Sequence, residues 1–180
     1  MPMPHHLPTF LVATGVLLSP YVVFAAPDVV ACDLLDEPTV SGLIGVKTKQ
    51  LVNRDKQTYG GVKISTCMYR ADRHSVMVTL AEYSSSAEAT KAYAIALKEA
   101  SQAKVVDKTP IQYKVESESG IGDKAYWYQL ESEQFGVTAI KGARGVTVNF
   151  QFSDSMTGAN VSARLKERSR PAIQSAVQKL

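Results

Sequence analysis

Two cysteines, Cys32 and Cys67, constrain this chain more than any other feature. They follow residues 9–26, which are mostly apolar, carry no charge and end in the small residues that signal peptidase prefers. An exported chain folds in an oxidising compartment, where two thiols persist as a disulfide. The sequence therefore predicts a Cys32–Cys67 disulfide that ties the start of the mature chain to a later hairpin. The alternative is two buried free thiols.

The expected organisation is a signal peptide over residues 1–25 and a single domain over residues 26–180. The segment before the apolar stretch lacks the usual Lys or Arg, so an uncleaved anchor is an alternative. A mostly apolar stretch of 18 residues lies at the short limit for a membrane-spanning helix. Either way we expect export to the periplasm or the outside of the cell.

A second alternative concerns Cys32. Residues 29–32, Val-Val-Ala-Cys, resemble the lipobox of bacterial lipoproteins, in which the cysteine is lipidated. Pro27 and Asp28 separate this tetrapeptide from the apolar stretch, whereas a lipobox normally closes such a stretch directly. Lipidation of Cys32 would exclude its disulfide and would make the protein membrane-anchored.

Charge and size narrow the class of protein. The 20 Lys and Arg against 17 Asp and Glu give a net charge of +3, and all of these residues follow the apolar stretch. So mild a surplus argues against a nucleic-acid binder, which would carry a basic stripe with interleaved aromatic residues. The mature length suits one compact core.

Alternation of apolar and polar residues predicts the strands. We expect strands over residues 62–71, 75–84, 125–131, 135–141 and 146–152, with a turn at 71–74. Residues 104–119 are ambiguous and contain one further candidate strand. Residues 47–61 are polar and without a pattern, so they are expected to form a loop.

Capping residues and helical spacing predict three helices. Asp36 begins a short helix that ends at Gly45, and Ser85 with Glu88 forms a capping box before a helix over residues 87–103. The last helix covers residues 160–180, where Pro171 predicts a kink or two consecutive helices. The order α-ββ-α-βββ-α predicts an α+β fold with a mostly antiparallel sheet of five to six strands.

Several segments together carry a resemblance to known proteins. They are Cys-Asp-Leu-Leu at 32–35 with the short helix after it, Ser-Thr-Cys-Met-Tyr at 65–69, Gly-Ile-Gly-Asp-Lys-Ala at 120–125, Ile-Lys-Gly at 140–142 and the basic last helix. In this layout the chain resembles small exported bacterial domains of unknown function, of periplasmic or lipoprotein type, with a PsbP-like α/β/α sandwich. The resemblance implies a secreted or periplasmic domain that acts by binding. Separately, we expect no cofactor.

Candidate catalytic groups are few. His74 is the one histidine after the signal, which excludes a multi-histidine zinc site and leaves His74, with Cys67 as a possible partner, for nucleophilic catalysis. Glu116 with Glu118, or Glu131 with Glu133, could form an acid pair for a hydrolase, or a calcium site. We expect no metal site. Gly120 and Gly122 lack the third glycine of a dinucleotide fingerprint and are expected to form a turn.

Two groups of residues are candidates for binding a ligand or partner. Tyr126, Trp127 and Tyr128 lie in one strand, so the tyrosines point to one side of the sheet and the tryptophan to the other. Core packing is one interpretation of this run and a ligand groove is the other. Arg164, Lys166, Arg168 and Arg170 make the last helix basic, which suits an anionic membrane surface or an acidic partner, or a solvated face.

The sequence thus predicts an exported, non-catalytic binding or accessory protein for a protein or a small hydrophobic ligand. A periplasmic immunity or inhibitor protein is a specific version of this prediction. The alternatives are a lipoprotein anchored at Cys32 and a hydrolase that uses His74 or the paired carboxylates.

Overall fold

A computed structural model describes residues 28–72, 74–102, 104–106, 109–130, 134–152 and 159–180. The predicted signal peptide lies outside these residues. In chain order the elements are α1 (Ala31–Leu34), α2 (Glu37–Ile44), β1 (Lys49–Tyr59), β2 (Val62–Ala71), β3 (His74–Glu82), α3 (Ser86–Ser101), β4 (Lys104–Val106), β5 (Thr109–Ile111), β6 (Lys114–Glu118), β7 (Lys124–Leu130), β8 (Gln134–Lys141), β9 (Arg144–Gln151) and α4 (Ala159–Gln178).

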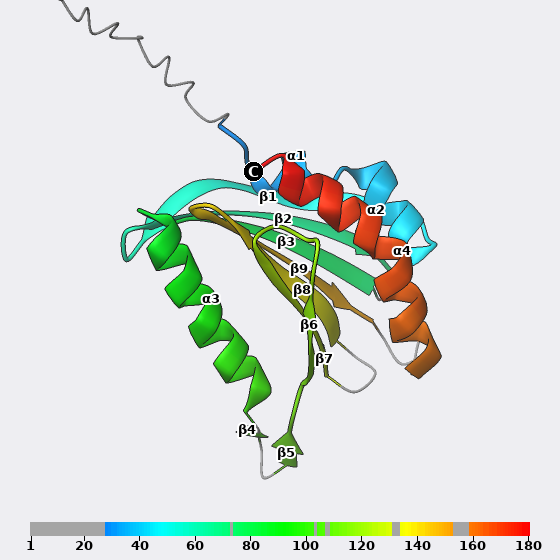
Figure 1. Cartoon of the computed structure of the whole chain (residues 1–180). Helices are drawn as coiled ribbons and strands as arrows, with labels where there is room; N and C mark the ends of the chain where they lie inside the picture. Colours follow the sequence, from blue (N-terminus) through cyan, green and yellow to red (C-terminus); the bar gives the residue numbers. More distant parts are fainter. Residues whose placement is uncertain (1–27, 73, 103, 107–108, 131–133, 153–158) are drawn as a thin grey trace, which may run out of the picture.

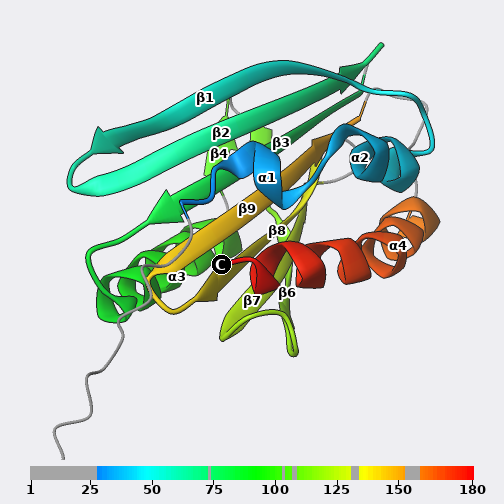
Figure 2. The same cartoon turned by 90° about the horizontal axis from the view of Figure 1, so that it is seen from above.

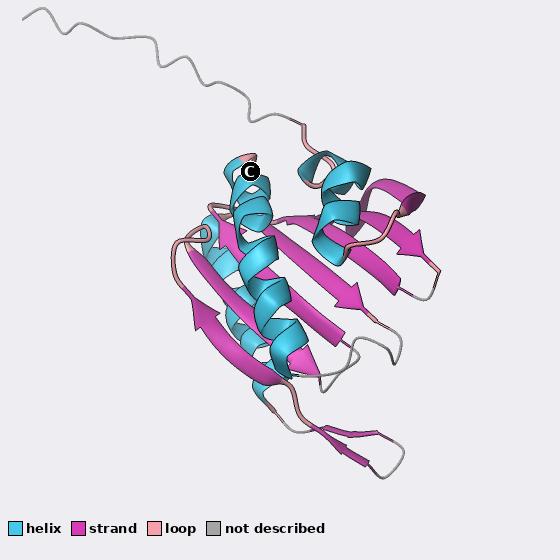
Figure 3. Ribbon diagram, turned by 90° about the vertical axis from the view of Figure 1, so that its right-hand side faces the viewer, coloured by secondary structure: helices cyan, strands magenta, loops and turns pink. Residues whose placement is uncertain are grey.

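One seven-stranded sheet organises the fold. Its strand order is β1-β2-β3-β9-β8-β7-β6, and every neighbouring pair is antiparallel. β4 and β5 form a separate hairpin, which projects away from the sheet in Figure 3. The predicted α+β class with a mostly antiparallel sheet is confirmed. The predicted number of strands, five to six, is too low.

The helices lie on both sides of the sheet. Helices α1, α2 and α4 cover one side, called here the packed face, and α3 lies on the other (Figure 1). The view from above shows α4 running across the strands near their centre (Figure 2). Within the described residues no helix is long and apolar enough to cross a membrane.

Strict alternation in β3 and β9 builds the centre of the core. Three register pairs, Val76–Phe150, Val78–Val148 and Leu80–Val146, point to the packed face and are almost completely buried. Burial of each such side chain contributes roughly 1.5–3 kcal/mol. These pairs lie under α1 and α4, whose own apolar residues Ala31, Ile173 and Ala176 are fully buried.

The expected loop at residues 47–61 is wrong, because this segment contains β1, the longest strand. β1 is an edge strand whose side chains are nearly all exposed, so it has no apolar alternation that the sequence could display. Its register with β2 shifts twice, between Gln50 and Val52 and between Arg54 and Gln57. Such bulges and the charged side chains between them protect an exposed edge from pairing with another chain.

Local capping signals are confirmed at the first two longer helices. The Asp36 side chain accepts a hydrogen bond from the Thr39 amide at 2.9 Å, and Gly45 ends α2 at φ +76°. The side chain of Thr39, together with its amide, lowers the pKa of Asp36. The Ser85 hydroxyl accepts a hydrogen bond from the Glu88 amide at 3.2 Å and begins α3.

Pro171 does not divide the last helix. α4 is one continuous helix with Pro171 inside it, so the alternative of two consecutive helices is wrong. Proline removes one main-chain hydrogen bond, but the apolar face formed by Leu165, Ile173 and Val177 stays buried against the packed face on both sides of it. Packing of this face therefore holds the helix together through the proline.

The predicted disulfide joins Cys32 of α1 to Cys67 of β2. Around it, the Ala31 amide donates to the Ser65 hydroxyl at 2.9 Å and the Tyr69 hydroxyl donates to the Leu35 carbonyl. Burial raises the pKa of Tyr69 to about 12. Because Cys32 is bonded to Cys67, the structure differs from both alternatives, two free thiols and a lipidated Cys32.

The side of the sheet opposite the packed face is only partly covered. Helix α3 packs there against β6, β8 and β9, and no described helix packs on the same side of β1, β2 and β3. We call this part of the sheet the open face. It consists of Lys49, Val52 and Arg54 of β1, Ile64, Thr66, Met68 and Arg70 of β2, and Ser75, Met77 and Thr79 of β3.

Candidate functional site

Trp127 points to the packed face, and only 2% of it is exposed. Its indole Nε1 donates to Glu118 Oε2 at 3.0 Å, and its ring stacks on Phe135 with centroids 5.2 Å apart. The Lys166 ammonium lies 5.8 Å from the centre of the same ring. The tryptophan is therefore surrounded by its own chain on this side of the sheet.

Tyr126 and Tyr128 point to the opposite side, as the alternation predicted. Tyr126 is buried under α3 with its ring centroid 5.3 Å from that of Tyr93, whereas Tyr128 is half-buried. The Tyr128 ring lies across Gly136 of β8, where any Cβ would collide with it. Burial raises the pKa of both tyrosines, so both phenols stay neutral in ordinary buffers.

The basic residues of α4 lie next to the carboxylates of β6. Lys166 Nζ is 3.1 Å from Glu116 and 3.4 Å from Glu118, and Arg170 is 2.9 Å from Glu118. Hydrogen bonds from Lys114 and Lys166 lower the pKa of Glu116. Two groups that the sequence offered as separate candidate sites thus lie together as one ion-pair network.

The other two basic residues of α4 are exposed. Arg168 lies beside the end of α2, with its guanidinium 3.5 Å from the Leu43 carbonyl oxygen, and Arg164 lies one turn earlier. The charge that α4 offers to an outside partner is therefore smaller than its sequence predicts.

Replacement of Glu118 by alanine is expected to destabilise the domain by about 2 kcal/mol, because it leaves the buried Trp127 N–H without its acceptor. Glu116→Ala is the matched control. Its side chain is 46% exposed, so its loss is expected to cost less than about 1 kcal/mol. Urea unfolding followed by Trp127 fluorescence measures both variants, and equal losses would contradict the assigned role of Glu118.

The candidate catalytic residues do not converge. Cys67 is in the disulfide, and His74 packs edge-on against Phe152 with centroids 5.7 Å apart. Four strand spacings, about 19 Å, separate the strand of His74 from that of Glu116 and Glu118. The pair Glu131 and Glu133 lies outside the described residues. Among the residues that are described, no three His, Cys, Asp or Glu side chains are grouped to hold a metal ion.

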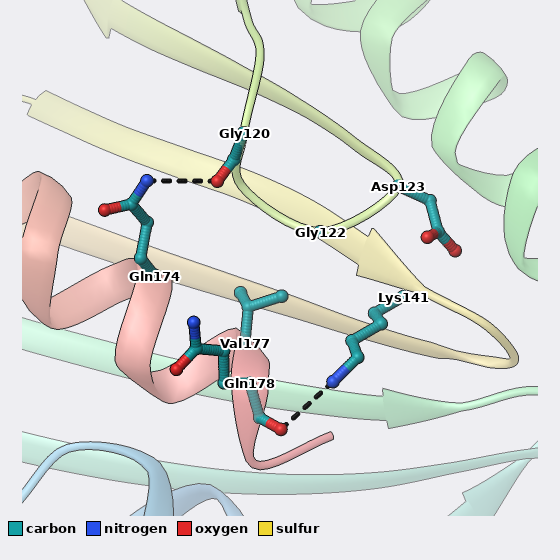
Figure 4. A pocket seen from close by; sticks show the side chains of 7 residues that line it. All are labelled: Gly120, Gly122, Asp123, Lys141, Gln174, Val177 and Gln178. Carbon is teal, nitrogen blue, oxygen red and sulfur yellow. Dashed lines mark hydrogen bonds between the residues drawn. The ribbon is translucent and has the colours of Figure 1, made fainter.

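The Gly120–Gly122 turn lies against α4 and borders a cavity of about 310 Å³ (Figure 4). Gln174 donates to the Gly120 carbonyl at 3.0 Å, and Lys141 donates to the Gln178 carbonyl at 3.0 Å. Asp123 accepts a hydrogen bond from the Gly142 amide at 2.7 Å. These polar groups bind one another, as expected for a structural turn.

A second cavity, of about 360 Å³, lies beside a charged cluster that the sequence did not reveal. Glu82 pairs with Lys56 at 3.0 Å and with Arg144 at 3.1 Å, and Lys56 also pairs with Asp28. The side chains of Lys56, Glu82 and Arg144 are all mostly buried. The cluster connects the start of the domain to β1, β3 and β9.

The open face offers a different surface, which sequence reasoning also missed. Val52, Met68 and Met77 lie opposite one another on β1, β2 and β3, and Asn149 follows on β9. We call these four residues the methionine row. All four are half-buried, and the buried Oδ1 atom of Asn149 accepts no hydrogen bond from any described residue. The strong alternation of β3 already placed Met77 opposite the core and could have drawn attention to this side.

Comparisons with known proteins identify the fold but no family. No protein-family model matches the chain, and no curated protein matches it. The structure is similar to the crystal structure of the extracellular domain of PknH from Mycobacterium tuberculosis, with a TM-score of 0.51 and 10% sequence identity. The match covers 87% of this chain and 100% of that one. The class of protein is therefore an α+β domain that shares its architecture with an extracellular domain.

Proposed function

We propose that this chain is an exported, non-catalytic binding domain and that the open face is its binding surface. The observation that carries this proposal is the half-buried methionine row, which crosses β1, β2 and β3 on the side of these strands where no described helix packs, and ends at Asn149 of β9. Methionine side chains are flexible and polarisable, so they suit adaptable binding surfaces. On the other side of the sheet, β2, β3 and β9 supply buried residues of the core.

Export is supported by three independent features. The uncharged apolar stretch at residues 9–26 has the form of a signal peptide. The Cys32–Cys67 disulfide suits an oxidising compartment such as the periplasm or the extracellular space. The similar fold of PknH belongs to an extracellular domain. An uncleaved membrane anchor formed by the apolar stretch is the alternative version of this proposal.

The residues predicted from the sequence have different places in this proposal. Tyr128 is half-buried and lies two strands beyond Asn149, so it extends the methionine row toward α3. Tyr126 and Trp127 support that strand from within the protein. On α4, Arg164, Arg168 and Arg170 are exposed, and Lys166 and Arg170 pair with Glu118 of β6.

A non-catalytic role is favoured because the residues suited to chemistry are dispersed or engaged in structural pairs. An immunity or inhibitor protein is one specific form of such a binding domain, with the open face as its contact surface. The PsbP-like layout implied by the sequence belongs to the same proposal.

Retention of partners from an envelope extract tests the proposed function. The Met68→Asp/Met77→Asp variant introduces charge into the methionine row, and Ile95→Asp, at an exposed apolar residue of α3, is the control. We expect the first variant to lose at least nine tenths of whatever the wild type retains, while the control keeps it. Thermal unfolding verifies that both variants are folded. Equal retention by both would contradict the proposal.

A further inference from the structure

We propose that the open face binds a single anionic amphiphile, a fatty-acid-like molecule with one carboxylate head and one apolar chain. This inference rests on the proposed function and names the ligand class for it. The argument uses the charge of the open face, the direction of the methionine row and the group at the inner end of that row.

All formal charges on the open face are positive. Lys49 and Arg70 are register partners on this side of β1 and β2, and Arg54 faces Thr66 a few residues further along. No Asp or Glu lies at a paired position on this side of β1, β2 or β3. The nearest acids in sequence are Asp55, within the second bulge of β1, and Asp72, beyond the end of β2.

The pairing of Lys49 with Arg70 points to a bound anion. Like charges directly opposite each other on neighbouring strands destabilise a sheet. Arg70 donates only a long hydrogen bond, 3.4 Å, to the Asp72 carbonyl, which does not neutralise its charge. A carboxylate placed between the two side chains would remove the repulsion and would gain charge-assisted hydrogen bonds.

The apolar part of the open face runs across the strands from this positive edge. The methionine row begins at Val52, between the Lys49–Arg70 pair and Arg54, and crosses β2 and β3 to reach β9. Three strand spacings make this path about 14 Å long. An extended dodecyl chain of about that length would cover Met68 and Met77 while its head remains at the β1 edge.

The inner end of the row favours an extended chain over a bulky ligand. Across the sheet, the register partner of Asn149 on the next strand, β8, is Gly136. The Tyr128 ring occupies the space above Gly136, where α3 begins to cover the sheet. The methionine row is flanked on one side by Arg54, Thr66, Thr79 and Thr147, and on the other by Lys49, Arg70, Ser75 and Gln151. The apolar strip is therefore about one side chain wide.

Methyl NMR of methionine tests the inference with the full chain. The sequence contains five methionines, and the two that fall within the described residues, Met68 and Met77, both lie on the open face. Sodium dodecanoate below its micelle concentration is expected to shift these two methyl signals saturably. Acetate, which has the same head, and a neutral dodecyl maltoside, which has the same chain, are expected to bind at least tenfold more weakly.

Charge variants separate the head group from the chain. Lys49→Gln/Arg70→Gln is expected to weaken dodecanoate binding at least tenfold, and Lys91→Gln/Lys98→Gln on exposed positions of α3 is expected to leave it unchanged. The wild-type comparison of dodecanoate with the neutral amphiphile stands even if a variant fails to fold. Equal affinity for the two amphiphiles, or shifts that spare Met68 and Met77, would overturn the inference.

Two further outcomes distinguish this inference from the proposed function. If the protein binds phosphatidylglycerol vesicles but not monomeric dodecanoate, the ligand of the open face is a membrane surface and not a single molecule. That result would overturn the inference. The wild type could also fail to bind dodecanoate and still retain a partner that the Met68→Asp/Met77→Asp variant loses. That result would overturn the ligand class and leave the proposed function intact.

Discussion

Loss of the disulfide is expected to lower the free energy of unfolding by about 4 kcal/mol. The bond joins two cysteines 35 residues apart in sequence, so it lowers the conformational entropy of the unfolded chain. The bond joins α1, whose Ala31 is fully buried, to β2, the strand next to the edge strand β1. Without it, only packing and a few hydrogen bonds hold α1 against the packed face.

Chemical unfolding of the oxidised wild type and of Cys32→Ala/Cys67→Ala measures this loss. The same comparison with the wild type under a reducing agent controls for the small cavity that alanine leaves at the buried Cys67. A loss below about 1 kcal/mol in both experiments would contradict the role of the disulfide, since native disulfides in small secreted domains typically contribute 2–5 kcal/mol.

Gly122→Ala is expected to be the most destabilising glycine substitution, with a loss of about 3 kcal/mol. Gly122 has φ +59°, where alanine is strained by about 1–2 kcal/mol. An added Cβ would also collide with the Ile140 carbonyl oxygen and lie 3.0 Å from Val177 Cγ1. Because the carbonyl belongs to the main chain of β8, the turn or α4 has to move.

Gly142→Ala is the matched control for this prediction. Gly142 has nearly the same φ, +58°, but an added Cβ there meets no atom within 4 Å. Its loss is expected to be about 1 kcal/mol, from backbone strain alone. Thermal unfolding of the two variants separates the collision from the strain, and equal losses would show that the close approach of the turn to Ile140 has no energetic effect.

Helices with capping residues and strands with apolar alternation could be predicted from the sequence. The Asp36 and Ser85 caps and the alternation of residues 146–152 each correspond to an observed helix or strand. β1 escaped prediction because its pattern comes from pairing with β2 at one edge rather than from burial of one side. Edge strands with exposed side chains carry no alternation for sequence reasoning to detect.

The candidate site was harder to predict because its residues meet through tertiary contacts. Lys166 and Glu116 are 50 residues apart in sequence, and only the packing of α4 across β6 brings them together. The methionine row joins β1, β2 and β3 to β9, although α3 and the strands β4 to β8 lie between β3 and β9 in sequence. In the sequence, the half-buried Thr, Met and Asn residues of this face look like ordinary surface residues. They stand out only once the structure shows which side of the strands forms the core.

Site-specific photocrosslinking in the producing cells tests the central claim, that the open face binds, most directly. Benzoylphenylalanine replaces Met77 in one protein and Ile95, which is 51% exposed on α3, in another. The account predicts a crosslinked product at position 77, identified by mass spectrometry, and none at position 95. Crosslinking at position 95, with none at position 77, would contradict it.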